Sequence, residues 1–339
     1  MDNEIVPAHY QQLKQQIGTL LRRGREQAGR TVNTILLQTY WHIGRHIVEF
    51  EQNGNIKAEY GSELLDRLSK DLTLEFGKGF SRSNLVYMRK FYLAFPKSET
   101  LSHQLTWSHY FEILKADSDL EISFYARQCE KENWSVRELK RQMKSMLFHR
   151  LALSKDKAEV LEIAQKGSEV QQPEDLIRDP YVFEFLGIRP QQPYVEGDLE
   201  QKLIQNLELF LLELGKGFAF VGRQYKITLA NRHFCVDLVF YHRILKCFVL
   251  IDLKSGEIEP ADIGQMNMYL NYFAREENVE GDNPPIGIVL GAYRDHILVE
   301  YATENVNNQL FVSKYQLYLP DKAQLQSELE RLLSDDQNG

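Results

Sequence analysis

The chain is poor in cysteine and lacks any long apolar run. Its three cysteines, Cys129, Cys235 and Cys247, are an odd number and form no CxxC pair, so neither a disulfide framework nor a cysteine-rich zinc site is indicated. We expect all three to be small buried residues in a reducing, cytoplasmic compartment. No apolar stretch approaches the roughly 18 residues of a membrane span, and the acidic start MDNEIVPAHY is unlike a secretory signal. No membrane association is therefore expected.

The composition is that of a soluble globular protein, with 43% apolar and 26% charged residues, and 339 residues are too many for one ordinary core. The charge is uneven between the two halves. Residues 1–150 hold 22 Lys and Arg against 18 Asp and Glu, a net +4, whereas residues 151–339 hold 18 against 30, a net −12. An acidic half binds a polyanion poorly unless its carboxylates hold a metal and the other half supplies positive surface.

Residues 8–155 are predicted to form an all-α N-terminal domain. The helices SELLDRLSKDLTLEF and SRSNLVYMRKFYLAF flank GKGF; Ser81 is the expected N-cap of the second, which should end before Pro96. Ser135 and Glu138 have the spacing of a capping box. The helix, glycine turn and basic helix resemble a helix-turn-helix, a nucleic-acid-binding motif. The candidate nucleic-acid-binding residues here and on the later helix are Arg82, Arg89, Lys90, Arg137, Lys140, Arg141 and Lys144. The alternative is that both basic faces are simply solvated.

Residues 156–193 are predicted to be a connector, because four of the ten prolines fall within 21 of its residues. The string YVFEFLGI inside it is too apolar for a free linker and should dock on one of the domains. Residues 194–335 show an α/β pattern. The expected order is a helix, three strands, a helix, two further strands and a closing helix, over residues 198–214, 218–229, 233–242, 247–254, 260–276, 285–293, 309–320 and 321–333.

Three charged residues interrupt two apolar strands: Asp237 in HFCVDLVFYH, and Asp252 and Lys254 in KCFVLIDLKSGE. Burying such groups costs several kcal/mol unless each has a partner. Asp252 and Lys254 share a strand face, and a hairpin would bring Asp237 beside them. Two carboxylates and a lysine on one wall suit a divalent cation, a phosphodiester and an attacking water. The alternative is structural, with Asp237 paired to Arg223 and Asp252 paired to Lys254.

Glu200 falls inside the apolar arc of its helix, whereas Glu208 and Glu213 fall on or beyond the edges of that arc. A carboxylate on a core-facing stripe needs a partner, so Glu200 is the fourth candidate for the site. The alternative is that Glu200 only favours the helix dipole in the first turn. Gln265 and Tyr269 are four residues apart and share a helix face, where Gln could orient a nucleophile or substrate. The alternative is that Tyr269 belongs to the core and Gln265 to solvent.

Taken together, these strings resemble a known family. Residues 198–291 are similar to a PD-(D/E)XK nuclease core, and their amino-acid sequence is similar to that of the YhcG-type nuclease family. The strings that carry the resemblance are DLEQKLIQNLELFLLELGKGFAFVGRQ, CVDLVFYH, LIDLKSGE and GQMNMYLNYF, and, in the N-terminal half, YWHIGRHI, AEYG, FGKGFSRSNLVYMRKFY, LTWSHY and NWSVRELKRQ. The resemblance thus spans nearly the whole chain and implies an all-α domain followed by a restriction-endonuclease-like α/β domain.

The resemblance also implies a Mg²⁺-dependent phosphodiesterase. The implied catalytic residues are Glu200, Asp237, Asp252, Lys254, Gln265 and Tyr269. Asp237 and Asp252, with the Leu253 carbonyl and Glu200, are the expected ligands of Mg²⁺, for which Mn²⁺ could substitute. One departure is that Asp252 stands where the family often has Glu, so this shorter side chain must lie closer to the metal.

The expected function is metal-dependent cleavage of nucleic acid by an endonuclease, with double-stranded DNA as the expected partner. Two alternatives stay open. One is a non-catalytic DNA-binding or scaffold protein on a nuclease fold, and the other is a helical adaptor whose basic helices bind an acidic protein. The sequence leaves the target and the oligomeric state open, a homo-oligomer included.

Overall fold

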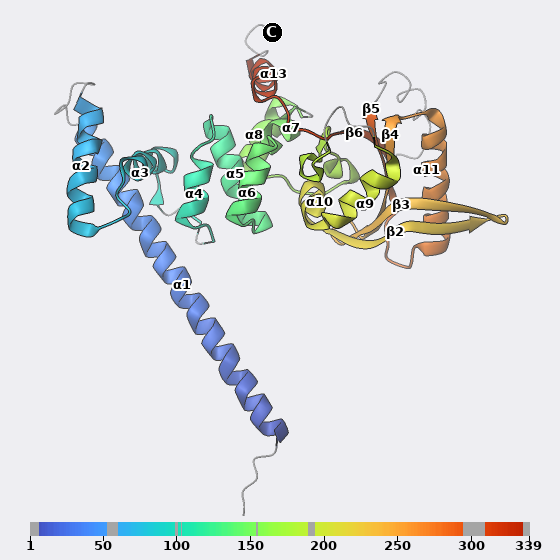
Figure 1. Ribbon diagram of the computed structural model, residues 1–339, viewed down its shortest axis with the longest axis horizontal. Helices are drawn as coiled ribbons and strands as arrows, with labels where there is room; N and C mark the ends of the chain where they lie inside the picture. Colours follow the sequence, from blue (N-terminus) through green and yellow to red (C-terminus); the bar gives the residue numbers. More distant parts are fainter. Residues whose placement is uncertain are drawn as a thin grey trace, which may run out of the picture. The chain divides into compact units, whose positions relative to one another are not determined.

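The computed structural model describes residues 7–52, 60–98, 101–102, 104–153, 155–188, 194–293 and 309–334. The chain forms two compact units, Met1–Lys140 and Arg141–Gly339 (Figure 1). Within the described residues, no helix is long and apolar enough to cross a membrane.

The described elements of the first unit are helices. They are α1 (Pro7–Gln52), α2 (Tyr60–Phe76), α3 (Arg82–Ala94), α4 (Trp107–Ile113), α5 (Asp119–Glu132) and the start of α6 (Val136–Lys144). The predicted ends of α3 are confirmed: the Ser81 side chain accepts a hydrogen bond from the Asn84 amide, and the helix stops before Pro96. The predicted capping box is confirmed too, because Ser135 and Glu138 each bond the other's backbone amide.

Helices α1 and α3 pack closely in this unit. Gly44 of α1 lies against the backbone of α3, where an added Cβ would come within 2.0 Å of the Met88 carbonyl oxygen. Only glycine permits this approach. Ile47, Leu65 and Leu85 are buried with Met88 in the adjoining apolar cluster.

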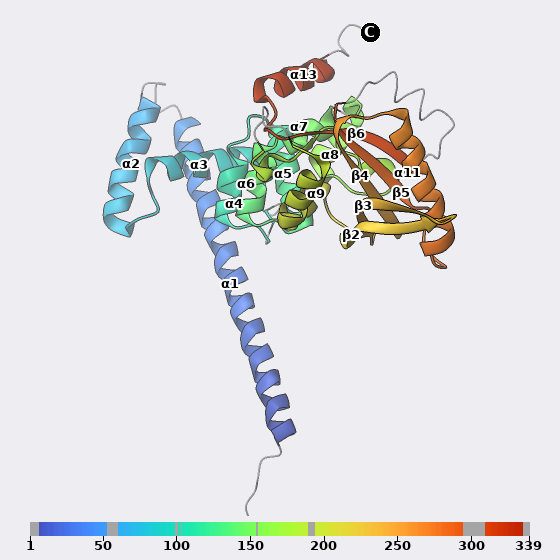
Figure 2. The same ribbon diagram turned by 45° about the vertical axis from the view of Figure 1, so that its right-hand side comes forward.

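The second unit is built on a six-stranded mixed sheet with strand order β1-β6-β5-β4-β3-β2 (Figure 2). β2, β3 and β4 are antiparallel neighbours, whereas β4, β5, β6 and β1 are parallel. The strands are β1 (Tyr181–Val182), β2 (Phe218–Leu229), β3 (Arg232–His242), β4 (Cys247–Glu257), β5 (Ile286–Tyr293) and β6 (Leu310–Gln316). The helices are α7 (Leu147–Ala152), α8 (Lys157–Lys166), α9 (Glu196–Gln205), α10 (Leu207–Leu214), α11 (Pro260–Tyr272) and α13 (Lys322–Ser334), with short turns at Pro173–Leu176, Glu184–Leu186 and Phe273–Glu277.

Helices α9 and α10 cover one face of the sheet and α11 covers the other (Figure 1). The single helix predicted over residues 198–214 is wrong, because the chain breaks at Asn206, with φ −115° and ψ 34°. The Asn206 side chain donates to the Lys202 carbonyl at 2.9 Å, a local bond that competes with continuation of the helix.

The connector is part of the second unit. Tyr181 and Val182 form β1, which pairs with β6, and Phe183, Leu186 and Ile188 are buried in the core. The prediction that YVFEFLGI docks on a domain is therefore confirmed.

One of the three cysteines departs from the prediction. Cys129 and Cys247 are buried, but Cys235 is exposed. Cys235 lies in the part of β3 that pairs with β2 beyond the last pairing with β4, at Leu238, so one edge of β3 is uncovered there.

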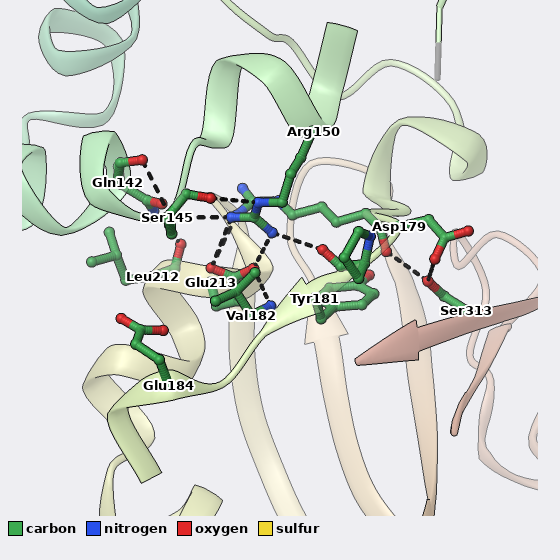
Figure 3. A network of polar contacts seen from close by, with 12 residues as sticks. Gln142, Ser145, Arg150, Asp179, Tyr181, Val182, Glu184, Leu212, Glu213 and Ser313 are labelled. Atoms are coloured by element: carbon green, nitrogen blue, oxygen red, sulfur yellow. Dashed lines mark hydrogen bonds and ion pairs between the residues drawn. The ribbon is translucent and has the colours of Figure 1, made fainter. Parts of the chain in front are cut away.

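A buried ion cluster holds the start of this unit together (Figure 3). Arg150 donates to the Glu213 carboxylate at 2.6 Å, Arg141 donates to it at 2.9 Å, and the Val182 amide donates to it at 2.9 Å. Burial alone would raise the pKa of Glu213, but the guanidinium groups of Arg150, Arg141 and Arg178 outweigh burial and lower this pKa to about 2. Glu213, which sequence patterning placed at or beyond the edge of the apolar arc, is a fully satisfied structural anion.

Candidate active site

Asp237 and Asp252 lie opposite one another on β3 and β4. The register pairs Leu238 with Ile251, so the next step along the antiparallel ladder sets Asp237 across from Asp252. The Leu253 amide donates to Asp237 Oδ2 at 2.8 Å. The hairpin expected from the sequence therefore brings the two aspartates together.

Asp252 is buried without full compensation. Its side chain is 3% exposed, and within the described residues the group that reaches its Oδ2 atom is the Lys254 ammonium, at 2.9 Å. Burial raises the pKa of Asp252, and the charge of Asp237 raises it further; Lys254 opposes both, and the resulting pKa is about 7. The two acids repel one another at close range, an arrangement that a cation would relieve.

Lys254 lies beside Asp252, as their shared strand face predicts. Its Nζ atom forms ion pairs with Asp252 Oδ2, at 2.9 Å, and with Asp262 Oδ1 in the first turn of α11, at 3.3 Å. Burial alone would lower the pKa of Lys254, but the carboxylates of Asp252 and Asp262 outweigh burial and raise it. The ammonium is therefore retained at neutral pH. Asp262 was not predicted from the sequence.

Glu200 reaches the site through a residue that the sequence did not indicate. The Gln224 side-chain amide donates both to Glu200 Oε2, at 2.5 Å, and to Asp237 Oδ1, at 3.0 Å. Burial raises the pKa of Glu200, and the hydrogen bond from Gln224 opposes that rise. Burial likewise raises the pKa of Asp237, against the hydrogen bond from the Leu253 amide. Gln224 thus bridges two acids that would otherwise repel directly.

A signal for Gln224 was present in the sequence. The β2–β3 hairpin turns at Ala230 and Asn231, both at positive φ, and counting outward from this turn places Gln224 opposite Asp237. Gln224 itself has φ +47°. A non-glycine residue in the left-handed region inside a strand is strained, and such strain is concentrated at functional sites.

Gln265 and Tyr269 share a face of α11 and bond one another, with the Gln265 amide donating to the Tyr269 hydroxyl. Tyr269 is buried and donates onward to the Cys235 carbonyl of β3 at 2.9 Å. The pair therefore ties α11 to the strand that carries Asp237. A direct role for either residue in chemistry stays a prediction.

Comparison with known proteins fits this geometry. Residues 174–330 match the YhcG PDDEXK nuclease domain, and residues 16–150 match the DUF1016 N-terminal domain. The chain is 39% identical, over an alignment of 361 positions, to "Putative nuclease YhcG" of Escherichia coli (strain K12), and the alignment covers 97% of this chain and 96% of that protein. The chain belongs to the YhcG nuclease family. Its second unit thus has the restriction-endonuclease-like fold that the sequence predicted.

Two solved structures are more distant. A repair endonuclease from Pyrococcus abyssi is 18% identical, with a TM-score of 0.26 over 39% of this chain and 50% of that one. The EndoMS–dsDNA2 complex is 15% identical, with a TM-score of 0.26 over 40% of this chain and 51% of that one.

The donor set of the site suits a hard divalent cation. Within the described residues, no three or more His, Cys, Asp or Glu side chains are grouped to hold a metal ion. The expected ligands include only two close carboxylates, those of Asp237 and Asp252, together with the Leu253 carbonyl. The Glu200 carboxylate is separated from Asp237 by the Gln224 amide, which donates to both. All are oxygen ligands, and Asp252 Oδ2 has the Lys254 ammonium at 2.9 Å as its neighbouring charge. The residues therefore fit Mg²⁺ or Mn²⁺ with water completing the shell.

The predicted nucleic-acid-binding residues are largely paired within the chain. In the first unit, Arg82 pairs with Asp66 at 3.1 Å, Arg89 with Glu51 at 2.6 Å and Lys140 with Glu112 at 3.2 Å, while the Lys90 ammonium lies 5.6 Å from the Tyr87 ring centre. Arg137 and Lys144 are exposed.

Arg141 is a correction to the predicted surface. Its side chain is 10% exposed and bonds Glu213, so the buried anion holds it away from phosphate.

Proposed function

We propose that this chain is a metal-dependent nuclease that hydrolyses phosphodiester bonds in double-stranded DNA as an endonuclease. Asp237, Asp252 and the Leu253 carbonyl would hold Mg²⁺, with Glu200 at its edge. The observation that carries the proposal is Asp252: a buried carboxylate that faces a second carboxylate, Asp237, and has a raised pKa beside a lysine that stays charged. A purely structural acid would be matched by cations and not placed against another acid.

The chain's own residues divide the chemistry. When bound, a divalent cation supplies charge neutralisation and Lewis acidity toward a phosphoryl oxygen and water. Lys254 can donate to a phosphate oxygen or hold the attacking water while the phosphorus–oxygen bond breaks. Gln224 fixes the carboxylates of Glu200 and Asp237, so the oxygen positions are set before substrate arrives.

Cleavage is tested with purified full chain on supercoiled plasmid, linear duplex, single-stranded DNA and RNA, in Mg²⁺, Mn²⁺ or EDTA. We expect nicked and linear plasmid in Mg²⁺ and no product in EDTA. Asp252→Asn is the catalytic control, prepared in parallel. Cleavage of RNA alone, cleavage in EDTA, or equal cleavage by Asp252→Asn would overturn the proposal, and DNA binding without cleavage would favour the scaffold alternative.

Metal binding has a readout independent of activity. Thermal melts with and without 10 mM Mg²⁺ should show a higher melting temperature with metal in the wild type, because a ligand that binds only the folded chain stabilises it. Asp252→Asn should lose most of that increase. An increase of the same size in both proteins would place the cation elsewhere.

A further inference from the structure

The first half of α1 is an uncovered helical arm. Every described side chain from Lys14 to Leu36 is exposed or half-buried, and Leu37 is the first buried residue among the described side chains of the helix. Asn33 contacts the rest of the first unit, because its side chain donates to the Leu105 carbonyl at 2.8 Å. Figure 1 shows this part of α1 extending beyond the other helices of its unit.

Among the described residues, the arm carries basic residues that are not paired with carboxylates, unlike Arg82, Arg89 and Lys140 of the predicted nucleic-acid-binding surface. It holds five basic residues against one acid, Glu26, for a net charge of 5 − 1 = +4; the basic residues are Lys14, Arg22, Arg23, Arg25 and Arg30. All are exposed, and in the described part of the chain no carboxylate pairs with them; Arg22 donates to the Thr19 hydroxyl at 3.2 Å. By contrast, Arg45 pairs with Glu49, Arg82 with Asp66 and Arg89 with Glu51.

The basic residues occupy one side of the arm. At about 100° per residue, they fall within an arc of about 180°, and they span about 24 Å at about 1.5 Å per residue. Ile17, Leu20 and Leu21 fall on the opposite side and are also exposed. A helix about 10–12 Å across fits the major groove of B-DNA, about 12 Å wide, with cations on its flanks near both strands.

We infer that residues 14–30 of α1 are a duplex-DNA-binding arm that contacts phosphates. Four of the five cations are arginine, whose fork suits phosphate oxygens. Three glycines (Gly18, Gly24, Gly29) and no aromatic residue lie in this stretch, which makes a poor membrane-interface helix. Within residues 14–30 the bulky apolar residues are Ile17, Leu20 and Leu21, while the exposed Val32, Ile35 and Leu36 lie beyond this stretch. The stretch itself therefore lacks the sustained apolar repeat of a coiled coil with a second copy. The choice of DNA as the polyanion rests on the proposed function.

The test is affinity for a 30-bp duplex, measured by fluorescence anisotropy in EDTA from 50 to 200 mM salt. The arm variant is Arg22→Gln/Arg23→Gln/Arg25→Gln/Arg30→Gln, in which Gln keeps helix propensity. The matched control removes four exposed cations elsewhere in the first unit: Arg67→Gln/Lys70→Gln/Lys78→Gln/Arg127→Gln. The arm variant should bind at least tenfold more weakly at 100 mM salt and lower the slope of log affinity against log salt by up to about 3.6, since each lost contact contributes about 0.9.

The other outcomes overturn the inference. Equal loss of DNA affinity in both variants, or unchanged DNA affinity in the arm variant, would each overturn it. So would an arm variant that keeps its DNA affinity but loses binding to anionic phosphatidylserine vesicles. An arm variant with a lower mass in solution and unchanged DNA affinity would overturn it as well. Because binding is measured in EDTA, failure of cleavage leaves this result intact. Conversely, if the arm variant still cleaves DNA and its DNA affinity is unchanged, the inference about the arm fails while the proposed nuclease function stands.

Discussion

Two buried acids in the same unit have opposite surroundings. Glu213 is surrounded by guanidinium groups and accepts a hydrogen bond from the Val182 amide, and its pKa falls to about 2. Asp252 faces another aspartate, with the ammonium of Lys254 beside it, and its pKa rises to about 7. The two acids are buried to a similar extent, so burial alone does not distinguish structure from function. The difference is that several guanidinium groups compensate the charge of Glu213, whereas, within the described residues, Asp252 has one ammonium and faces a second carboxylate.

The largest expected effect is the loss of cleavage activity when the Asp252 carboxylate is removed. Asp252→Asn should reduce Mg²⁺-dependent plasmid cleavage roughly a thousandfold, about 4 kcal/mol of transition-state stabilisation, because a metal ligand is lost. Gel assays at equal folded concentration measure it. Glu208→Gln, which removes one exposed acid from α10, should cleave like the wild type. A similar loss in both variants would attribute the effect to charge in general.

Removing a partner of the satisfied acid should affect stability instead. Arg150→Met leaves Glu213 buried with one guanidinium fewer, and breaking a buried pair costs about 3–5 kcal/mol. Urea unfolding monitored by circular dichroism measures this. As a control, Lys166→Met breaks an exposed pair with Glu162 and should leave the unfolding midpoint unchanged. An unchanged midpoint for Arg150→Met would mean that the cluster is not needed for the fold.

The two acids should respond to pH with opposite signs. The pKa of Asp252 is raised from 3.8 to about 7, so its contribution to stability falls as pH rises through that interval. Asp252→Asn cannot ionise and should be about 2 kcal/mol more stable than wild type at pH 8 without metal, with no gain near pH 4.

Glu213 should show the reverse trend. Its pKa is lowered from 4.5 to about 2, so its contribution is present above pH 4.5 and is lost as pH falls toward 2. Glu213→Gln should therefore be less stable than wild type at pH 7, with a difference that shrinks below pH 4.5. Urea unfolding at a series of pH values in EDTA checks both variants, and parallel curves for the two would contradict the comparison.

The smallest effect is expected at Gln224. Gln224→Ala removes the amide that opposes the raised pKa of both Glu200 and Asp237, so both acids should ionise at higher pH. Cleavage should fall about tenfold at neutral pH, and the acidic limb of the pH–rate profile should move upward. Gln201→Ala, at an exposed position of α9, is the control. A lower rate with an unmoved pH profile would make Gln224 merely structural.

The sequence predicted the elements of the site better than its connections. β2 occupies residues 218–229 as expected, because Gly217 precedes it and the apolar residues Tyr225, Ile227 and Leu229 alternate along its second half. Asp252 and Lys254 share a face because strand parity requires it. Asp262 could not be placed, since its contact depends on how the first turn of α11 lies over β4.

Glu213 was missed for a different reason. Its partners, Arg141 and Arg150, lie more than 60 residues earlier, and helical periodicity describes only its own helix. Long-range pairing of this kind follows from tertiary packing, which no local pattern records.

The strand β1 sets a limit on how this chain could exchange parts with its relatives. Two residues of the connector, Tyr181 and Val182, complete the parallel side of the sheet, and the next amide, from Phe183, donates to the Gln316 carbonyl at 2.7 Å. A recombination event that joined two relatives at residue 190 would take β1 from one relative and β6 from the other. If the two strands then failed to pair, β6 would become an unpaired edge strand that favours aggregation. Crossovers that preserve solubility should therefore cluster upstream of Arg141, where the helical half can be inherited without disturbing the sheet.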